Sequence, residues 1–280
     1  MQCNTWPLSV CTWSLRTDVA GVVAAVRDLG LDHVNLALRP ALADGGEEYL
    51  AVVRRQNWTI SATTIGFPQE DYSTLESIRA TGGIVSDEHW ERNRDIVFRA
   101  IRITEELGVR YLSLHAGFIE ESDAARAKTT GDRMTELADG AAERGIMLLM
   151  ETGQETAENL KRFLEEVNHP ALGVNLDPAN MVLYGKGDPV AAVHTLAPWI
   201  KHVHVKDALR TKQLGTWGQE APWGDGDVGA DAFLKALGDI GFDGVLAVER
   251  ECVDDRLGDI RLAIERLVEA GTRLQAGGTA

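Results

Sequence analysis

The chain has few cysteines and no long apolar run. Cys3, Cys11 and Cys252 form an odd, sparse set without a Cys-x-x-Cys pair, which argues against a disulfide framework, a zinc knuckle or a dithiol redox motif. No stretch approaches the roughly 20 apolar residues that a membrane helix needs. The first four residues do not begin a basic segment followed by an apolar one. We therefore expect a protein of the reduced cytoplasm, without a secretory signal or a membrane-spanning segment.

Basic residues are also scarce. The 28 lysines and arginines are outnumbered by 43 acidic residues, and the net charge is −15. Such a field repels a phosphate backbone and an anionic membrane surface, so neither nucleic acid nor membrane is expected as a partner. Hydrophobic residues make up 44% of the 280 residues, enough for a substantial core. Association into a homo-oligomer is left open.

Short apolar segments alternate with longer helical patterns. The predicted strands are rich in Val, Ile and Leu without sustained polar alternation, as in a parallel sheet buried on both faces. They are residues 8–13, 33–37, 58–64, 111–115, 146–151, 172–176, 202–205 and 244–249. Helical patterns lie at residues 18–29, 90–107, 123–144, 156–168, 189–196, 230–240 and 255–270, with a weaker one at 46–56.

This alternation predicts the fold class. Eight strand–helix units in 280 residues favour an α/β protein with a single (β/α)8 TIM barrel over residues 1–275, followed by a flexible tail at 276–280. A doubly wound open sheet is the alternative. It would need a glycine-rich phosphate turn after the first strand, and residues 14–17 are not one.

Two longer insertions, at residues 65–88 and 208–229, follow predicted strands. Both therefore belong to the C-terminal face of the barrel, where active sites lie. Both contain glycines, and the second carries Trp217 and Trp223, so we expect loops that close over a bound molecule. Packing of the two tryptophans at an interface between copies of the chain is the alternative.

Four successive predicted strands end in residues of metal-ligand type. Glu151, Asp177 and Glu249 end the fifth, sixth and eighth strands, and His204 lies near the end of the seventh. Consecutive strand ends converge on one pocket, where a carboxylate is costly unless it is paired or bound to a cation. Three carboxylates and one imidazole suit a single divalent ion such as Mn²⁺, Mg²⁺, Co²⁺ or Zn²⁺.

Two more histidines lie near that pocket. His202 shares a strand face with His204 because side chains alternate along a strand. It is expected either to support His204 from the layer below or to be a satisfied core histidine. His115 ends the fourth strand and is expected to face the substrate, with a packing role as the alternative.

Around these residues the sequence resembles the xylose-isomerase-like barrel superfamily, in its sugar phosphate isomerase/epimerase branch. The similar strings are residues 150–154, 175–180, 202–207, 224–228 and 247–249, and the resemblance covers nearly the whole chain. It implies that Glu151, Asp177, His204 and Glu249 bind the metal and that the two glutamates move the proton. It also implies a carbohydrate or cyclitol substrate that loses a proton alpha to a carbonyl and forms an enediolate. The residues expected to bind this substrate are Trp13, His115, Gln154, Asn180, Lys206, Asp207, Arg210 and Trp223.

The substrate-binding residues match that branch only in part. Its ketose 3-epimerases have a second glutamate where this chain has Ala157, a histidine at Asn180 and a glutamate at Asp207, whereas Arg210 matches. A carbon–oxygen lyase or hydratase acting on keto-sugars or keto-inositols is therefore an alternative to an isomerase or epimerase. A non-catalytic binding protein on a barrel scaffold is a more remote one.

The apurinic endonuclease branch fits less well. It needs extra histidines for a trinuclear zinc site, and this chain has Asn180 and residues 225–227 at two of those positions. The acidic, aromatic loop at 217–227 favours a neutral sugar ring over a phosphate dianion. The basic residues Lys206 and Arg210 instead favour a phosphate group.

Overall fold

The computed structural model of the chain describes residues 1–119, 124–213 and 215–277. Its strands are β1 (Gln2–Cys3), β2 (Trp6–Cys11), β3 (His33–Ala37), β4 (Thr59–Thr64), β5 (Tyr111–Leu114), β6 (Met147–Glu151), β7 (Leu172–Leu176), β8 (Ile200–Val205), β9 (Asp207–Leu209), β10 (Gln219–Ala221) and β11 (Val245–Val248). Its helices are α1 (Val19–Asp28), α2 (Arg39–Leu42), α3 (Gly46–Val53), α4 (Leu75–Thr81), α5 (Trp90–Glu106), α6 (Ala124–Ala142), α7 (Ala157–Val167), α8 (Pro178–Leu183), α9 (Pro189–Leu196), α10 (Ala230–Asp239) and α11 (Arg256–Gly277), with 3-10 turns η1 (Thr12–Leu15) and η2 (Asp87–His89).

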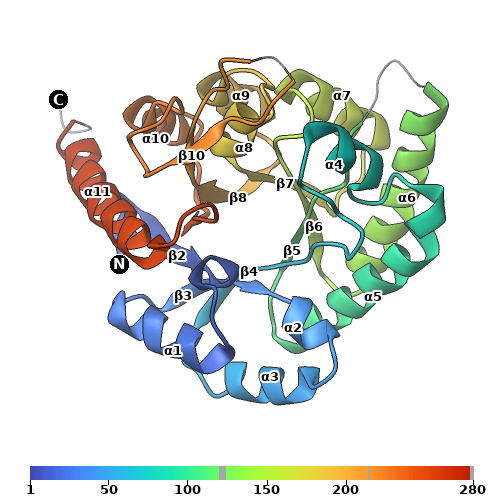
Figure 1. Cartoon of the computed structure of the whole chain (residues 1–280), viewed down its shortest axis with the longest axis horizontal. Helices are drawn as coiled ribbons and strands as arrows, with labels where there is room; N and C mark the ends of the chain where they lie inside the picture. Colours follow the sequence, from blue (N-terminus) through green and yellow to red (C-terminus); the bar gives the residue numbers. More distant parts are fainter. Residues whose placement is uncertain (120–123, 214, 278–280) are drawn as a thin grey trace.

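The strands β2 to β8 and β11 close into a parallel barrel. β2 pairs with β3 on one side and with β11 on the other, and every pairing around this ring is parallel. The short β1 adds to β2 in antiparallel orientation. Figure 1 shows the helices as a ring around these strands. The predicted (β/α)8 barrel is confirmed, and the open-sheet alternative is wrong.

The last helix is longer than the sequence pattern predicts. α11 continues to Gly277 instead of ending at residue 270. A Cβ on Gly271 would lie 2.3 Å from the backbone nitrogen of Asn4, so glycine allows α11 to pack closely on the N-terminal strand. Gln275 Nε2 then donates to the Asn4 carbonyl at 3.2 Å. Residues 276 and 277 of the expected tail are therefore helical, and residues 278–280 lie outside the described part of the chain.

Polar side chains fill part of the barrel interior and bond to one another. The Ser61 hydroxyl lies 3.3 Å from Ser9 Oγ and 3.0 Å from His202 Nε2. His202 Nδ1 lies 3.0 Å from Asn175 Oδ1, and Asn175 Nδ2 donates to Ser113 Oγ at 3.3 Å. Because buried polar groups are stable only when they have partners, this network fixes the side chains directly below the C-terminal ends of the strands.

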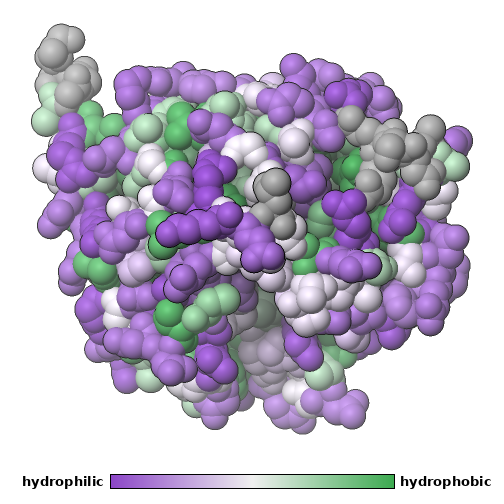
Figure 2. Space-filling model, turned by 45° about the horizontal axis from the view of Figure 1, so that its top comes forward, coloured by the Kyte–Doolittle hydropathy of each residue, from purple (hydrophilic) through white to green (hydrophobic). Residues whose placement is uncertain are grey.

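The apolar core lies between the strands and the surrounding helices. Hydrophilic side chains cover most of the face shown in Figure 2. Among the described residues, the exposed large hydrophobic ones are Met1, Tyr72, Leu209 and Val268. No described helix is long and apolar enough to span a membrane.

Both insertions are fastened to the barrel. In the first, the half-buried Glu70 carboxylate accepts the backbone N–H groups of Phe67 at 2.9 Å and Gly83 at 3.1 Å. Asn93 of α5 donates to the Gly83 carbonyl at 2.8 Å. The second insertion contains the antiparallel β9–β10 pair. Both insertions follow the C-terminal ends of barrel strands, β4 and β8; closure over a substrate remains a prediction.

Candidate metal centre

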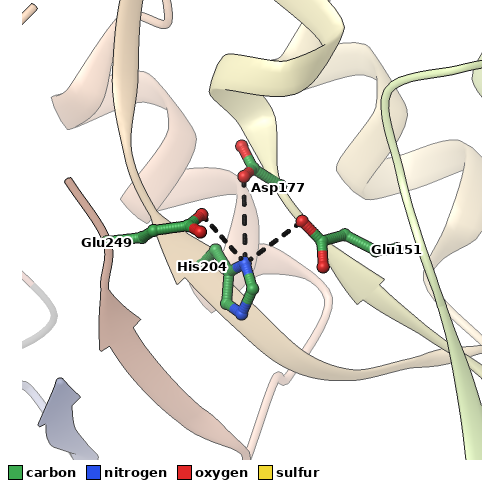
Figure 3. A group of neighbouring side chains, drawn as sticks. All are labelled: Glu151, Asp177, His204 and Glu249. Atoms are coloured by element: carbon green, nitrogen blue, oxygen red, sulfur yellow. Dashed lines mark ion pairs between the residues drawn. The ribbon is translucent and has the colours of Figure 1, made fainter. Parts of the chain in front are cut away.

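Four side chains from neighbouring strand ends meet above the polar interior (Figure 3). Glu151 ends β6, Asp177 follows β7, His204 lies in β8 and Glu249 follows β11. All four are buried, and one ligand atom from each lies within 4.8 Å of the others. The sequence prediction that these strand ends converge therefore agrees with the geometry.

The imidazole of His204 lies at the centre of the group. Its Nδ1 is 3.2 Å from Glu249 Oε2, 3.5 Å from Glu151 Oε1 and 3.8 Å from Asp177 Oδ2. The two glutamates approach this nitrogen from opposite sides in Figure 3. Three carboxylates and one ring nitrogen can therefore contact a single ion placed between them.

The unpartnered atoms of this group fit a cation. His204 Nδ1, Asp177 Oδ2 and Glu249 Oε2 are buried and have no hydrogen-bond partner. Lys206 Nζ lies 3.3 Å from Glu249 Oε2 and 3.8 Å from Asp177 Oδ2 without forming a hydrogen bond to either. A buried polar atom without a hydrogen bond costs about 1–3 kcal/mol, so three at one point indicate a missing partner. Three carboxylates and one imidazole are a donor set for a divalent ion of the Mg²⁺, Mn²⁺, Co²⁺ or Zn²⁺ type. The residues present therefore fit the metal that the sequence predicts.

Neighbouring side chains orient the His204 ring. His204 Nε2 lies 2.9 Å from Asn35 Oδ1, and Asn35 Nδ2 donates to the Ala62 carbonyl at 2.8 Å. Because that bond fixes the amide, we infer that Asn35 presents its oxygen to Nε2 and that Nε2 carries the ring proton. The lone pair of Nδ1 then points toward the carboxylates, as a metal ligand requires.

Asp177 is positioned by the helix that follows it. Its Oδ1 accepts the backbone N–H of Asn180 at 2.9 Å and so caps the N-terminus of α8, which has Pro178 in its first turn. The Asp177 backbone N–H is also held by Thr152 Oγ1 at 2.8 Å. With Oδ1 used by the cap, only Oδ2 faces the centre.

Burial and charge act in opposite directions on the three carboxyl groups. Burial raises the pKa of Asp177 to about 6, against the nearby Lys206 charge. Burial also opposes ionisation of Glu249, but Lys206 and His204 lower its pKa to about 2. His115 and His204 likewise hold the pKa of Glu151 well below its ordinary value in spite of burial. A divalent cation would act in the same direction as these positive charges and favour three ionised ligands.

Three residues predicted to bind substrate lie beside the glutamates. Trp13 Nε1 donates to Glu249 Oε1 at 2.6 Å, and its ring centroid is 5.6 Å from that of His204. Asn180 Nδ2 donates to Glu151 Oε1 at 3.1 Å. His115 Nε2 lies 3.4 Å from the same oxygen. These contacts hold the two glutamates in place and border the space in front of them.

Lys206, also predicted to bind substrate, is buried beside Glu249. Its Nζ is 3.3 Å from Glu249 Oε2, 3.1 Å from Glu251 Oε2 and 3.7 Å from Glu220 Oε1. Sequence reasoning missed Glu220 and Glu251. Glu251 could have been found from its place two residues after Glu249, whereas nothing in the sequence around Glu220 signals its role.

His202 lies one layer below the centre. Both of its ring nitrogens have partners in the interior network, and burial lowers its pKa to about 3, which keeps it neutral. Its ring centroid is 5.8 Å from that of His204. His202 is thus a core histidine with both ring nitrogens satisfied. It also supports Asn175, whose Nδ2 lies 3.0 Å from His204 Nε2.

Three other predicted substrate-binding residues are engaged elsewhere. Asp207 accepts backbone N–H groups from the loop at 224–228. Arg210 is exposed, and its Nη1 donates to the Gly187 carbonyl at 3.2 Å. Trp223 is 4% exposed and packs against Phe233 of α10, with 6.2 Å between the two ring centroids. The expectation that Trp223 covers a sugar face is therefore replaced by a role in the core.

Comparison with known proteins agrees with this architecture. The family model described as the xylose isomerase-like TIM barrel matches residues 23–270. The chain belongs to this family. A ketose 3-epimerase from Arthrobacter globiformis is 25% identical over 247 residues, which cover 85% of this chain and 80% of that protein.

Solved structures show the same fold. A xylose isomerase domain protein from Planctomyces limnophilus is 29% identical with a TM-score of 0.86, over 97% of this chain and 98% of that one. A xylose isomerase-like barrel protein from Mycobacterium smegmatis, solved in complex with magnesium, is 21% identical with a TM-score of 0.73, over 98% and 99% of the two chains.

Proposed function

We propose that this member of the family is a divalent-metal-dependent isomerase or epimerase of a sugar or cyclitol. The observation that carries the proposal is the pair of buried glutamates, Glu151 and Glu249, on opposite sides of a point lined by unpartnered ligand atoms. The similarity to a ketose 3-epimerase supports it.

The glutamates suit proton transfer next to a carbonyl. A bound divalent ion would supply Lewis acidity that stabilises negative charge on the substrate oxygens. Glu151 or Glu249 would take the proton alpha to the carbonyl, which leaves a flat enediolate, and the other glutamate would return a proton from the opposite face. Return from the opposite face inverts that carbon, which is epimerisation.

Hydrogen bonds to the glutamates keep this geometry. The bond from Trp13 to Glu249 Oε1 leaves Oε2 facing the centre, and the bond from Asn180 fixes Glu151. Carboxylates held in this way act as acid and base without reorganising during the reaction.

A carbon–oxygen lyase or hydratase is the second candidate. The observation that favours it is the buried Lys206 ammonium, 3.3 Å from Glu249 Oε2. A positive hydrogen-bond donor at this place would stabilise a hydroxyl that leaves from the same enediolate. The two reactions share their first step and differ in whether that group departs.

Proton exchange measured by NMR in D₂O tests the proposal. The protein is incubated with Mn²⁺, Mg²⁺, Co²⁺ or Zn²⁺ and a panel of ketoses, keto-inositols and 3-keto-glycosides. We expect deuterium to enter alpha to the carbonyl of at least one compound, and EDTA to stop the exchange. A new epimer or isomer identifies the first candidate and an unsaturated product the second. Absence of exchange with every compound and metal would contradict both.

A further inference from the structure

A row of aromatic rings lies beside the metal centre. Tyr184, which follows α8, has its ring centroid 5.8 Å from that of Phe118 and 4.7 Å from that of Trp217, with edge-to-face geometry in both pairs. Phe118 is buried and Tyr184 and Trp217 are half-buried. The three residues come from the segments after β5, β7 and β8, so the fold brings them together from distant parts of the sequence.

The row is firmly attached to the barrel. The backbone N–H of Gly218, next to Trp217, donates to the Leu183 carbonyl at 3.3 Å, which joins the β9–β10 insertion to α8. Gly153 has a φ of +136°, and a Cβ there would lie 2.5 Å from Asn180 Cβ. Glycine is therefore needed for the chain after β6 to approach α8 and bring Gln154 next to Tyr184.

Two buried N–H donors in this region have no partner. Gln154 Nε2 and Trp217 Nε1 make no hydrogen bond, and Gln154 is only 2% exposed. A buried donor without a partner costs about 1–3 kcal/mol. Two such donors beside one tyrosine indicate a ligand that offers oxygen acceptors.

Tyr184 lies close to the metal centre along α8. Burial raises its pKa. The Tyr184 backbone N–H donates to the Asn180 carbonyl at 2.9 Å, and the Asn180 side chain donates to Glu151 Oε1 at 3.1 Å, so Tyr184 lies one helical turn from a residue that contacts the metal centre. Aromatic rings with nearby neutral donors match a sugar, whose C–H faces pack on rings while its hydroxyls accept hydrogen bonds.

We propose that Gln154, Tyr184 and Trp217 form a subsite for the hydroxylated carbons of a neutral substrate that are remote from the reacting carbonyl. This inference rests on the proposed function and adds the part of the substrate that sets specificity. None of the three side chains carries a charge, and the nearby cations Arg79 and Lys186 lie over the Phe118 ring at 5.0 and 5.5 Å. The subsite therefore suits an uncharged polyol chain or ring better than a phosphate group.

Binding of polyols tests the subsite without requiring turnover. The full chain, with Mg²⁺ present, is titrated by calorimetry with glycerol, erythritol, ribitol and D-sorbitol. We expect affinity to rise about tenfold from glycerol to D-sorbitol, a gain of about 1.4 kcal/mol. Gln154→Leu and Trp217→Phe each remove most of this rise and change glycerol binding by less than about twofold.

Two matched controls exclude a general effect of the substitutions. Gln56→Leu and Trp199→Phe change the same residue types outside the site, since Gln56 Nε2 donates to Val52 and Trp199 precedes β8. Circular dichroism verifies that all variants are folded. The controls should keep the wild-type rise in affinity.

Several results would overturn the subsite. One is a wild-type affinity that does not depend on polyol length, and another is an unchanged rise in both site variants. An equal loss of the rise in affinity in the two control variants would also contradict the subsite. Tighter binding of sorbitol 6-phosphate than of D-sorbitol would show an anion site instead. Failure of the proposed function is seen separately, as absence of deuterium exchange.

Discussion

The two glutamates of the centre have different neighbours although they have the same side chain. Glu249 receives a short hydrogen bond from Trp13 and lies near Lys206, whereas Glu151 lies between His115 and Asn180. Each environment leaves one buried carboxylate facing the space beside His204. Both are therefore placed for acid–base work, and each can be tested singly.

We predict that Glu151→Gln and Glu249→Gln each lower the exchange rate by at least about 100-fold. Glutamine keeps the shape of glutamate but cannot carry the proton. The measurement is deuterium exchange together with metal content, because loss of metal alone would also stop the reaction. Glu158→Gln, at an exposed position in α7, is the control. A variant that holds metal and keeps the wild-type rate would remove that glutamate from the mechanism.

Glu155 offers a test of burial at a residue outside the ligand set. Burial raises its pKa from 4.5 to about 8, so the folded state keeps its proton over a range where the unfolded state has lost it. Its contribution to stability is therefore present below pH 4.5 and is lost as the pH rises toward 8.

We predict that Glu155→Gln flattens this pH dependence. Relative to wild type, the variant should gain up to about 4 kcal/mol of stability between pH 5 and pH 8, because glutamine does not ionise. Thermal unfolding followed by circular dichroism in EDTA measures this difference without changes in metal loading. An equal pH dependence in the two proteins would show that Glu155 ionises freely in the folded state.

At the level of elements, Asp207 organises the second insertion. Its carboxylate accepts the backbone N–H groups of Ala208, Gly224, Gly226 and Val228 at 2.8 to 3.1 Å. A Cβ on Gly226 would lie 2.1 Å from Asp207 Oδ1, so a glycine is needed at that position. The aspartate thus joins the end of β8 to the loop before α10.

We predict that Asp207→Ala lowers the free energy of unfolding by about 2–4 kcal/mol, because four amides lose a charged acceptor. Limited proteolysis should also cut residues 208–229 faster. Asp225→Ala is the matched control: its half-exposed ion pair with Arg266 is worth less than about 1 kcal/mol. Similar losses in both variants would contradict the role given to Asp207.

The elements that the sequence predicted are those with a clear apolar pattern. The barrel strands were found within a few residues of their ends, because burial on both faces gives continuous apolar runs, and so were the long helices apart from the C-terminal end of α11. β9, β10 and α8 were missed because elements of three to six residues carry little periodicity. The Asp177–Pro178 pair did contain a cap signal for α8.

Side-chain direction was the harder part of the site to predict. The predicted ligands Glu151, Asp177, His204 and Glu249 lie at the ends of neighbouring strands, and barrel closure alone makes them converge. Loop residues have no such constraint. Trp223 packs into the core, and Asp207 binds backbone amides, because tertiary contacts decide these directions.

On the scale of the whole molecule, acidic groups are concentrated at the centre of an already acidic protein. Three buried carboxylates face one point, and Glu220 and Glu251 lie close by around Lys206. A cation that binds only the folded state would offset this repulsion and stabilise the entire barrel. We therefore propose that the folded chain holds one divalent ion between Glu151, Asp177, His204 and Glu249.

The most direct test is elemental analysis of protein reconstituted with Mn²⁺ and freed of excess metal. Wild type is compared with Asp177→Ala and with Asp177→Asn, which keeps an N-cap for α8; circular dichroism verifies that all three are folded. We predict one ion per wild-type chain and a large loss of metal in both variants. Equal metal content in wild type and in both folded variants would contradict the proposal.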